Sequence, residues 1–175
     1  VLAIHGYLAA PLDVRALSEY VHKNAGVDVL LIRLPGHGTT AADLKDRSRF
    51  EWTESVLEAY QVLSKEYQDV MVMGVSMGAL LALQLASKEK LRALICISTM
   101  LVSKDFRLRL GTPFVRLLAW LLRVVFRVDY LKSIVKPERE GSIYEQTPVA
   151  STAQLFDLMK DVRRLLPNIS VPTMI

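Results

Sequence analysis

The feature that most constrains the fold is residues 70–82, where an apolar run rich in β-branched residues leads into Gly74-Val75-Ser76-Met77-Gly78 and then into an Ala- and Leu-rich run. A strand, a tight Gly-x-Ser-x-Gly turn and a helix make up a nucleophile elbow, which presents a serine hydroxyl above a sheet. The two glycines lack Cβ atoms, so the turn can close and the helix can approach neighbouring strands. The pattern therefore predicts Ser76 as a catalytic nucleophile, with Gly74 and Gly78 shaping the elbow.

Two backbone N–H groups are candidates for binding the negative charge of an acyl-transfer intermediate. The N–H of Met77 lies at the expected start of a helix, where donors are unpaired and the helix dipole favours negative charge. A second donor in such sites comes from the loop after a neighbouring strand, where this sequence has His5-Gly6-Tyr7. We expect Tyr7 N–H to be that donor and His5 and Gly6 to support the loop. The Tyr7 ring either lines an acyl site or simply packs.

Strand and helix signals alternate along the chain, which predicts an α/β fold. Continuous apolar strands that alternate with helices indicate a mostly parallel sheet covered on both faces. The expected strands are Val1–Ile4, Val27–Arg33, Val70–Val75, Leu91–Ser98 and Val171–Ile175, and the expected helices are Pro11–Asn24, Glu51–Gln68, Met77–Ser87 and Thr152–Leu166.

Residues 100–150 interrupt this alternation and are expected to form a helical cap inserted between two parts of the α/β core, 1–99 and 151–175. A helix is expected from Thr112-Pro113 onward, because Thr is a good N-cap and Pro a good first residue. Arg116, Trp120, Arg123 and Arg127 would share one stripe of it. Three interpretations remain open: an apolar roof over an acyl pocket, a transient contact with anionic lipid interfaces, or a buried helix with one exposed stripe.

Composition excludes several classes of protein. A net charge of +4 is too small to indicate nucleic acid, and 51% hydrophobic residues argue against disorder. No metal-ligand spacing and no phosphate-binding loop is present, so neither a metal nor a cofactor is expected. The lone Cys96 is expected to be a small buried residue. With no visible signal segment, we expect a cytoplasmic location.

All three histidines, His5, His22 and His37, precede Ser76. In an elbow-based triad the order along the chain is Ser, then Asp or Glu, then His. We therefore interpret all three as non-catalytic. Because the sequence starts and stops inside apolar strands, we also expect a fragment of a longer protein. The catalytic Asp and His are expected beyond Ile175, and the 175 residues alone are expected to be nearly inactive.

Four motifs occur in a characteristic order: His5-Gly6-Tyr7, Pro35-Gly36-His37-Gly38, Gly74-Val75-Ser76-Met77-Gly78 and Val171-Pro172-Thr173. In this order the chain resembles the α/β-hydrolases, and more narrowly the compact bacterial carboxylesterases and monoacylglycerol lipases. The resemblance implies a serine hydrolase that cleaves short- or medium-chain esters or monoacylglycerols through an acyl-serine intermediate.

The same resemblance implies Ser76 as nucleophile and Tyr7 and Met77 as the oxyanion hole. Two alternatives stay open. A peptidase or thioesterase could use the same fold, because fold does not set the substrate. A binding protein that has lost its triad would also fit the absence of a histidine after Ser76.

Overall fold

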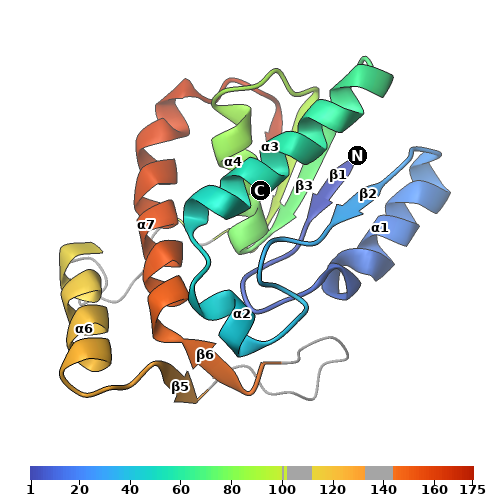
Figure 1. Cartoon of the computed structure of the whole chain (residues 1–175). Helices are drawn as coiled ribbons and strands as arrows, with labels where there is room; N and C mark the ends of the chain where they lie inside the picture. Colours follow the sequence, from blue (N-terminus) through green and yellow to red (C-terminus); the bar gives the residue numbers. More distant parts are fainter. Residues whose placement is uncertain (100, 102–111, 133–143) are drawn as a thin grey trace.

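The computed structural model describes residues 1–99, 101, 112–132 and 144–175, and these form an α/β structure around a parallel sheet (Figure 1). The sheet has five strands in the order β2-β1-β3-β4-β7, and every pair is parallel. The strands are β1 (Leu2–Ile4), β2 (Leu30–Ile32), β3 (Met71–Val75), β4 (Ala93–Ile97) and β7 (Thr173–Met174). The predicted fold class is confirmed.

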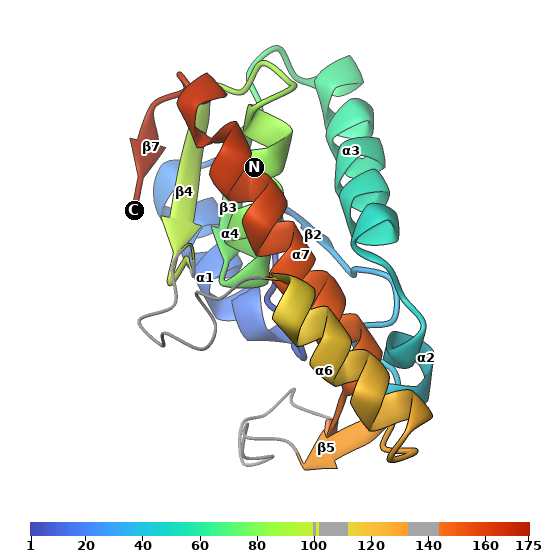
Figure 2. The same cartoon turned by 90° about the vertical axis from the view of Figure 1, so that its left-hand side faces the viewer.

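Helices cover both faces of this sheet (Figures 1 and 2). One face carries α1 (Pro11–Ala25), and the other carries α3 (Arg49–Glu66) and α4 (Met77–Ala86). A further helix, α7 (Val149–Leu165), packs over α3 and α4, and α6 (Thr112–Val124) packs on α7. The remaining helical elements are α2 (Ala41–Lys45) and a 3₁₀ turn (Leu166–Asn168).

The described part of residues 100–150 contributes no strand to the main sheet. It holds α6 and a small antiparallel pair formed by β5 (Tyr130–Lys132) and β6 (Gln146–Pro148). Four other basic residues of this stretch lie outside the described residues: Lys104, Arg107, Arg109 and Lys136. The division into a core (1–99 and 151–175) and a cap (100–150) stays a prediction.

The expectation of a buried strand at Val27–Arg33 was wrong in length and in burial. Only Leu30–Ile32 form a strand, and Leu30 is 37% exposed. The strand is at an edge of the described sheet, where one side has no neighbour. An apolar run alone does not tell an edge strand from a central one.

The expected helical stripe also ends early. Helix α6 stops at Val124, and Arg127 lies beyond it with a φ of 54°. That left-handed conformation cannot continue a right-handed helix. Arg127 is therefore not on the face that Arg116, Trp120 and Arg123 occupy.

Close backbone approach holds α4 against the centre of the sheet. A Cβ built on Gly78 would lie 2.6 Å from the His5 carbonyl oxygen and closer still to that of Ile4. A Cβ on Gly74 would meet the backbone of Gly78 and Ala79. Eight of the ten α4 residues are buried, so this helix is the centre of the core.

We expect Gly78→Ala to lower the free energy of unfolding by at least ~3 kcal/mol, because neither β1 nor α4 can move without repacking the core. Gly26→Ala is the matched control: Gly26 has φ +63° but open space around its Cβ position. That variant should lose only ~1 kcal/mol, the cost of a left-handed alanine. Urea unfolding at pH 7 measures both, and equal losses would contradict the packing argument.

Candidate active site

The candidate site lies at the carboxyl ends of the parallel strands, at the point where the order of strand addition reverses. From β1 the chain runs to β2 on one side, and later returns to β3 on the other side of β1. Open α/β sheets bind ligands in the crevice at such a switch point. The loops that follow β1 and β3 meet here, and they carry Gly6 and Ser76.

Ser76 adopts a strained backbone conformation between β3 and α4. Its φ is 54° and its ψ is −111°, outside the regions favoured by L-residues. Its N–H donates to the Ile97 carbonyl oxygen at 2.8 Å, so β4 closes the turn. Strained residues persist only where surrounding packing holds them, and they gather at functional sites. Leu8 and Ser98, which follow β1 and β4, also have positive φ.

The loop after β1 lies against the serine. A Cβ on Gly6 would be 3.4 Å from Ser76 Cβ and 3.9 Å from its Oγ. Since the two loops touch, the backbone next to Gly6 borders the space in front of the hydroxyl. This is the juxtaposition that an oxyanion hole shared by Tyr7 and Met77 requires.

His5 connects the loops that follow β1 and β2. Its Nε2 accepts from the Leu34 N–H at 3.2 Å, so its Nδ1 must carry the proton and donate to the Gly6 carbonyl oxygen at 2.9 Å. The ring is fully buried. Burial lowers the pKa of His5, which keeps it neutral. Both ring nitrogens of His5 are hydrogen-bonded to the backbone.

His37 is fully buried among three aromatic rings. Those of His5, Trp52 and Tyr7 lie 5.2, 5.6 and 5.8 Å away. Its Nδ1 contacts the Pro35 carbonyl oxygen at 3.1 Å, and its Nε2 has no partner among the described residues. Burial, and then the neighbouring His5, lower the pKa of His37 to about 4. In the described structure, no hydrogen bond joins Ser76 Oγ to either histidine.

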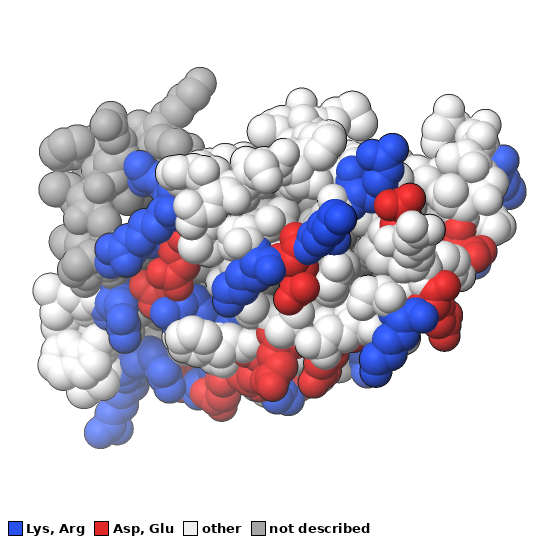
Figure 3. Space-filling model, turned by 90° about the horizontal axis from the view of Figure 1, so that it is seen from above, with Lys and Arg blue, Asp and Glu red and all other residues white. Residues whose placement is uncertain are grey.

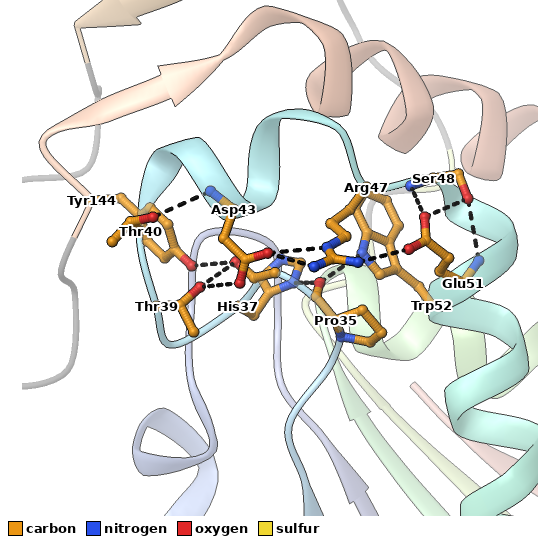
Figure 4. Close-up of polar contacts among 11 residues, drawn as sticks. Pro35, His37, Thr39, Thr40, Asp43, Arg47, Ser48, Glu51, Trp52 and Tyr144 are labelled. Carbon is orange, nitrogen blue, oxygen red and sulfur yellow. Dashed lines mark hydrogen bonds and ion pairs between the residues drawn. The ribbon is translucent and has the colours of Figure 1, made fainter.

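The Pro35–Gly38 loop is held by side chains from distant parts of the chain (Figure 4). Trp52 Nε1 donates to the Pro35 carbonyl oxygen at 3.1 Å, and Tyr144 Oη donates to that of Gly36 at 2.8 Å. Arg47 pairs with Asp43 and Glu51 beside them. Tyr144 is 1% exposed, so its contact is part of the core.

The two carboxylates of α7 pair with an arginine and not with a histidine of the site. Asp161 and Asp157 lie 2.9 and 3.8 Å from Arg49, the first residue of α3. They join two helices and follow no strand of the sheet. Another aspartate that follows Ser76 in the sequence, Asp105, lies outside the described residues. Within the ranges the structure describes, no three His, Cys, Asp or Glu side chains form a metal-binding group.

Sequence reasoning missed one polar contact of the site. The Tyr7 hydroxyl lies 2.8 Å from Ser151 Oγ and 3.0 Å from Thr152 Oγ1. Its partners are 144 and 145 residues away along the chain. No local pattern signals such a pair.

Surface charge is mixed on the face seen from above (Figure 3). Basic and acidic side chains lie beside one another across most of this face. Cys96 is 2% exposed, as expected of a small buried residue. Among the described helices, none is long and apolar enough to cross a bilayer. The cytoplasmic location stays a prediction.

Comparison with known proteins defines the class that this fold and site represent. A family model described as "Alpha/beta hydrolase family" matches residues 1–175. The chain belongs to the α/β-hydrolase family. The structure is also similar to a solved structure from work on LipS and LipT, two metagenome-derived lipolytic enzymes, with a TM-score of 0.82 and 25% identity over 98% of this chain and 68% of that one.

Two curated relatives give narrower points of comparison. A thermostable monoacylglycerol lipase of Bacillus sp. (strain H-257) is 32% identical over all of this chain and 67% of its own length. A carboxylesterase of Bacillus subtilis (strain 168) is 25% identical over all of this chain and 69% of its own length. The 175 residues thus span about two thirds of these relatives.

The depressed pKa of His37 predicts a loss of stability in acid. An unfolded histidine titrates near pH 6.5, whereas His37 in the fold resists protonation down to about pH 4. Between these values the unfolded state binds more protons, so the free energy of unfolding falls as pH drops, by up to about 3 kcal/mol. His5 contributes in the same direction.

Urea unfolding between pH 7 and pH 4 measures this slope. In His37→Phe, which keeps a ring against Tyr7 and Trp52, the slope should become much shallower. His22→Gln, at an exposed histidine of α1, is the control and should follow the wild type. Parallel profiles for His37→Phe and wild type would contradict the assignment.

Proposed function

We propose that the protein hydrolyses carboxylic esters through an acyl-serine intermediate on Ser76. The observation that carries this proposal is the strained Ser76 turn at the switch point of the sheet, with the Gly6 loop so near that a Cβ on Gly6 would lie 3.4 Å from Ser76 Cβ. A serine needs this presentation to react, because its hydroxyl is a weak nucleophile. The names of the two curated relatives support monoacylglycerols or other carboxylic esters as substrates. The short or medium length of the acyl chain stays a prediction.

In the first step Ser76 Oγ attacks the carbonyl carbon while a general base removes its proton. The carbonyl oxygen becomes negative, and the N–H groups of Tyr7 and Met77 donate to it. Collapse breaks the ester bond, and the alcohol leaves with the proton from the base. Water then attacks the acyl-serine by the same route, releasing the carboxylic acid and restoring Ser76.

The general base of this scheme is proposed to come from outside residues 1–175. Both nitrogens of His5 are bonded to the backbone, and His37 is buried with its Nδ1 at the Pro35 carbonyl. His22 is exposed on α1. The 175 residues alone should therefore accelerate the reaction at most ~10³–10⁴-fold over water. This is the rate enhancement that an oxyanion hole and substrate binding provide without a triad.

A fluorophosphonate probe tests the nucleophile in the protein as its gene encodes it. Stable labelling is expected at Ser76, because only an activated serine reacts. Ser76→Ala should lose the label and lower kcat for a p-nitrophenyl ester by roughly 10⁵–10⁶-fold. Ser87→Ala, which removes a hydroxyl bonded to the Gln84 carbonyl at the end of α4, is the matched control.

Three outcomes would change the proposal. Full esterase activity in Ser76→Ala would make the assignment of the nucleophile wrong. An unlabelled Ser76 in an intact fold would favour the binding-protein alternative. Activity on thioesters or peptides in place of oxygen esters would keep the mechanism and change the substrate class.

A second proposal concerns the outer surface of α6. Leu117, Trp120 and Val124 are 53–58% exposed, and their spacing places them on one side of the helix. They line a groove of about 740 Å³ together with three cations and one anion, Lys45, Arg116, Arg123 and Asp129. Lys45 and Arg123 both pair with Asp129 and Arg116 lies 3.9 Å from Asp157, so the rim keeps one net positive charge. An apolar surface with a positively charged rim suits an anionic lipid interface. We propose that α6 makes a transient contact with such interfaces.

Co-sedimentation with vesicles checks this contact. Binding should rise with the fraction of phosphatidylglycerol in phosphatidylcholine vesicles and fall in Trp120→Ala and Arg116→Gln. Tyr20→Ala, which removes a 65%-exposed aromatic side chain from α1, is the control. Binding that ignores anionic lipid content would contradict the proposal.

A further inference from the structure

The Tyr7 hydroxyl takes part in a hydrogen-bond chain that the proposed reaction does not use. It lies 2.8 Å from Ser151 Oγ, 3.0 Å from Thr152 Oγ1 and 3.5 Å from the Pro148 carbonyl oxygen. Thr152 Oγ1 in turn lies 2.7 Å from the same carbonyl oxygen. All of these partners belong to the first turn of α7 and the residue before it.

The direction of each hydrogen bond in this series follows from its last member, the bond between Thr152 and the Pro148 carbonyl oxygen. The Thr152 hydroxyl has one proton, which it donates to the Pro148 carbonyl oxygen, so it can only accept a hydrogen bond from Tyr7. Tyr7 therefore donates to Thr152, and the Ser151 hydroxyl donates to Tyr7. Ser151 is fully buried, so water cannot replace its contact. Burial raises the pKa of Tyr7, which keeps the phenol protonated and able to donate.

The other end of the Tyr7 side chain is the backbone that borders Ser76. Tyr7 directly follows Gly6, whose Cβ position is 3.4 Å from Ser76 Cβ. Its ring packs edge-on against His37 and Trp52, at 5.8 and 6.1 Å between centroids. With the ring held on its sides and at its tip, the Tyr7 N–H has little freedom to turn away.

The segment that supplies the partners is itself anchored at a second point near the site. Tyr144 donates to the Gly36 carbonyl oxygen, in the loop after β2. Residues 144–152 therefore hold the loops that follow both β1 and β2. Residues 144–150 belong to the predicted cap (100–150), so this end of the cap contacts the site.

We propose that Ser151 and Thr152 are positioning residues: through the Tyr7 hydroxyl they fix the loop whose N–H completes the oxyanion hole. The inference rests on the proposed function, because it assigns Tyr7 N–H to the oxyanion. The interaction it protects exists only in the transition state, so its loss lowers kcat and leaves substrate binding nearly unchanged.

Steady-state kinetics of the gene-encoded protein with p-nitrophenyl butyrate test this. Tyr7→Phe should lower kcat about tenfold with KM within about twofold, and should weaken inhibition by a trifluoromethyl ketone by a similar factor. Thr152→Val should behave likewise, and Thr152→Ser, which keeps the hydroxyl, should recover most of the lost rate. Ser151→Ala should lower kcat less, since Tyr7 keeps Thr152 as its acceptor.

Matched controls remove similar hydrogen bonds away from the site. Tyr60 Oη donates to the Lys90 carbonyl at 2.9 Å, and buried Ser18 Oγ donates to that of Val14 at 2.8 Å. Tyr60→Phe and Ser18→Ala should lose thermal stability comparable to Tyr7→Phe and Ser151→Ala while kcat stays unchanged. This contrast separates positioning from a general loss of stability.

The outcomes distinguish this inference from the proposed function. If the fluorophosphonate labels Ser76 but Tyr7→Phe and Thr152→Val keep kcat and ketone affinity within about twofold of wild type, the positioning role is overturned and the serine hydrolase assignment stands. If Ser76 of the wild type is not labelled and no ester is turned over, both are overturned.

Discussion

The whole arrangement depends on the absence of Cβ atoms where α4 meets the sheet. At Gly78 the helix backbone lies so close to β1 that a methyl group would overlap the Ile4 and His5 carbonyl oxygens. At Gly74 the strand backbone is equally close to the first turn of the helix. This approach turns the chain sharply at Ser76, holds its φ at 54° and places the N-terminus of a buried helix behind the hydroxyl.

The site is assembled from loop ends that meet because the strands are parallel. Each loop alone is weakly determined, and contacts between them fix their positions: Ser76 N–H to Ile97, Leu34 N–H to His5, and Tyr144 to Gly36. The buried, neutral His5 serves this purpose, because its imidazole accepts from the loop after β2 and donates within the loop after β1. Burial lowers the pKa of both His5 and His37, which makes the fold sensitive to acid.

Much of the fold could be predicted because it is encoded locally. The glycine spacing around Ser76 and the apolar runs beside it placed β3 and α4 within a residue of their observed bounds. The exposure of Leu30 could not be predicted, because strand order decides which strand lies at an edge. The hydrogen bond between Tyr7 and Ser151 could not be predicted either, because residues so far apart in the sequence meet only in the complete fold. The oxyanion and nucleophile roles stay predictions.

The most direct test of the account is a crystal structure of the gene-encoded protein after reaction with a phosphonate ester, whose phosphonyl oxygen takes the place of the oxyanion. The account predicts a covalent bond from Ser76 Oγ to phosphorus. It also predicts that the phosphonyl oxygen lies about 2.7–3.1 Å from the backbone nitrogens of both Tyr7 and Met77. A phosphonyl oxygen turned away from these two groups, or an adduct on another residue, would contradict the central claim that this turn and loop form one catalytic site.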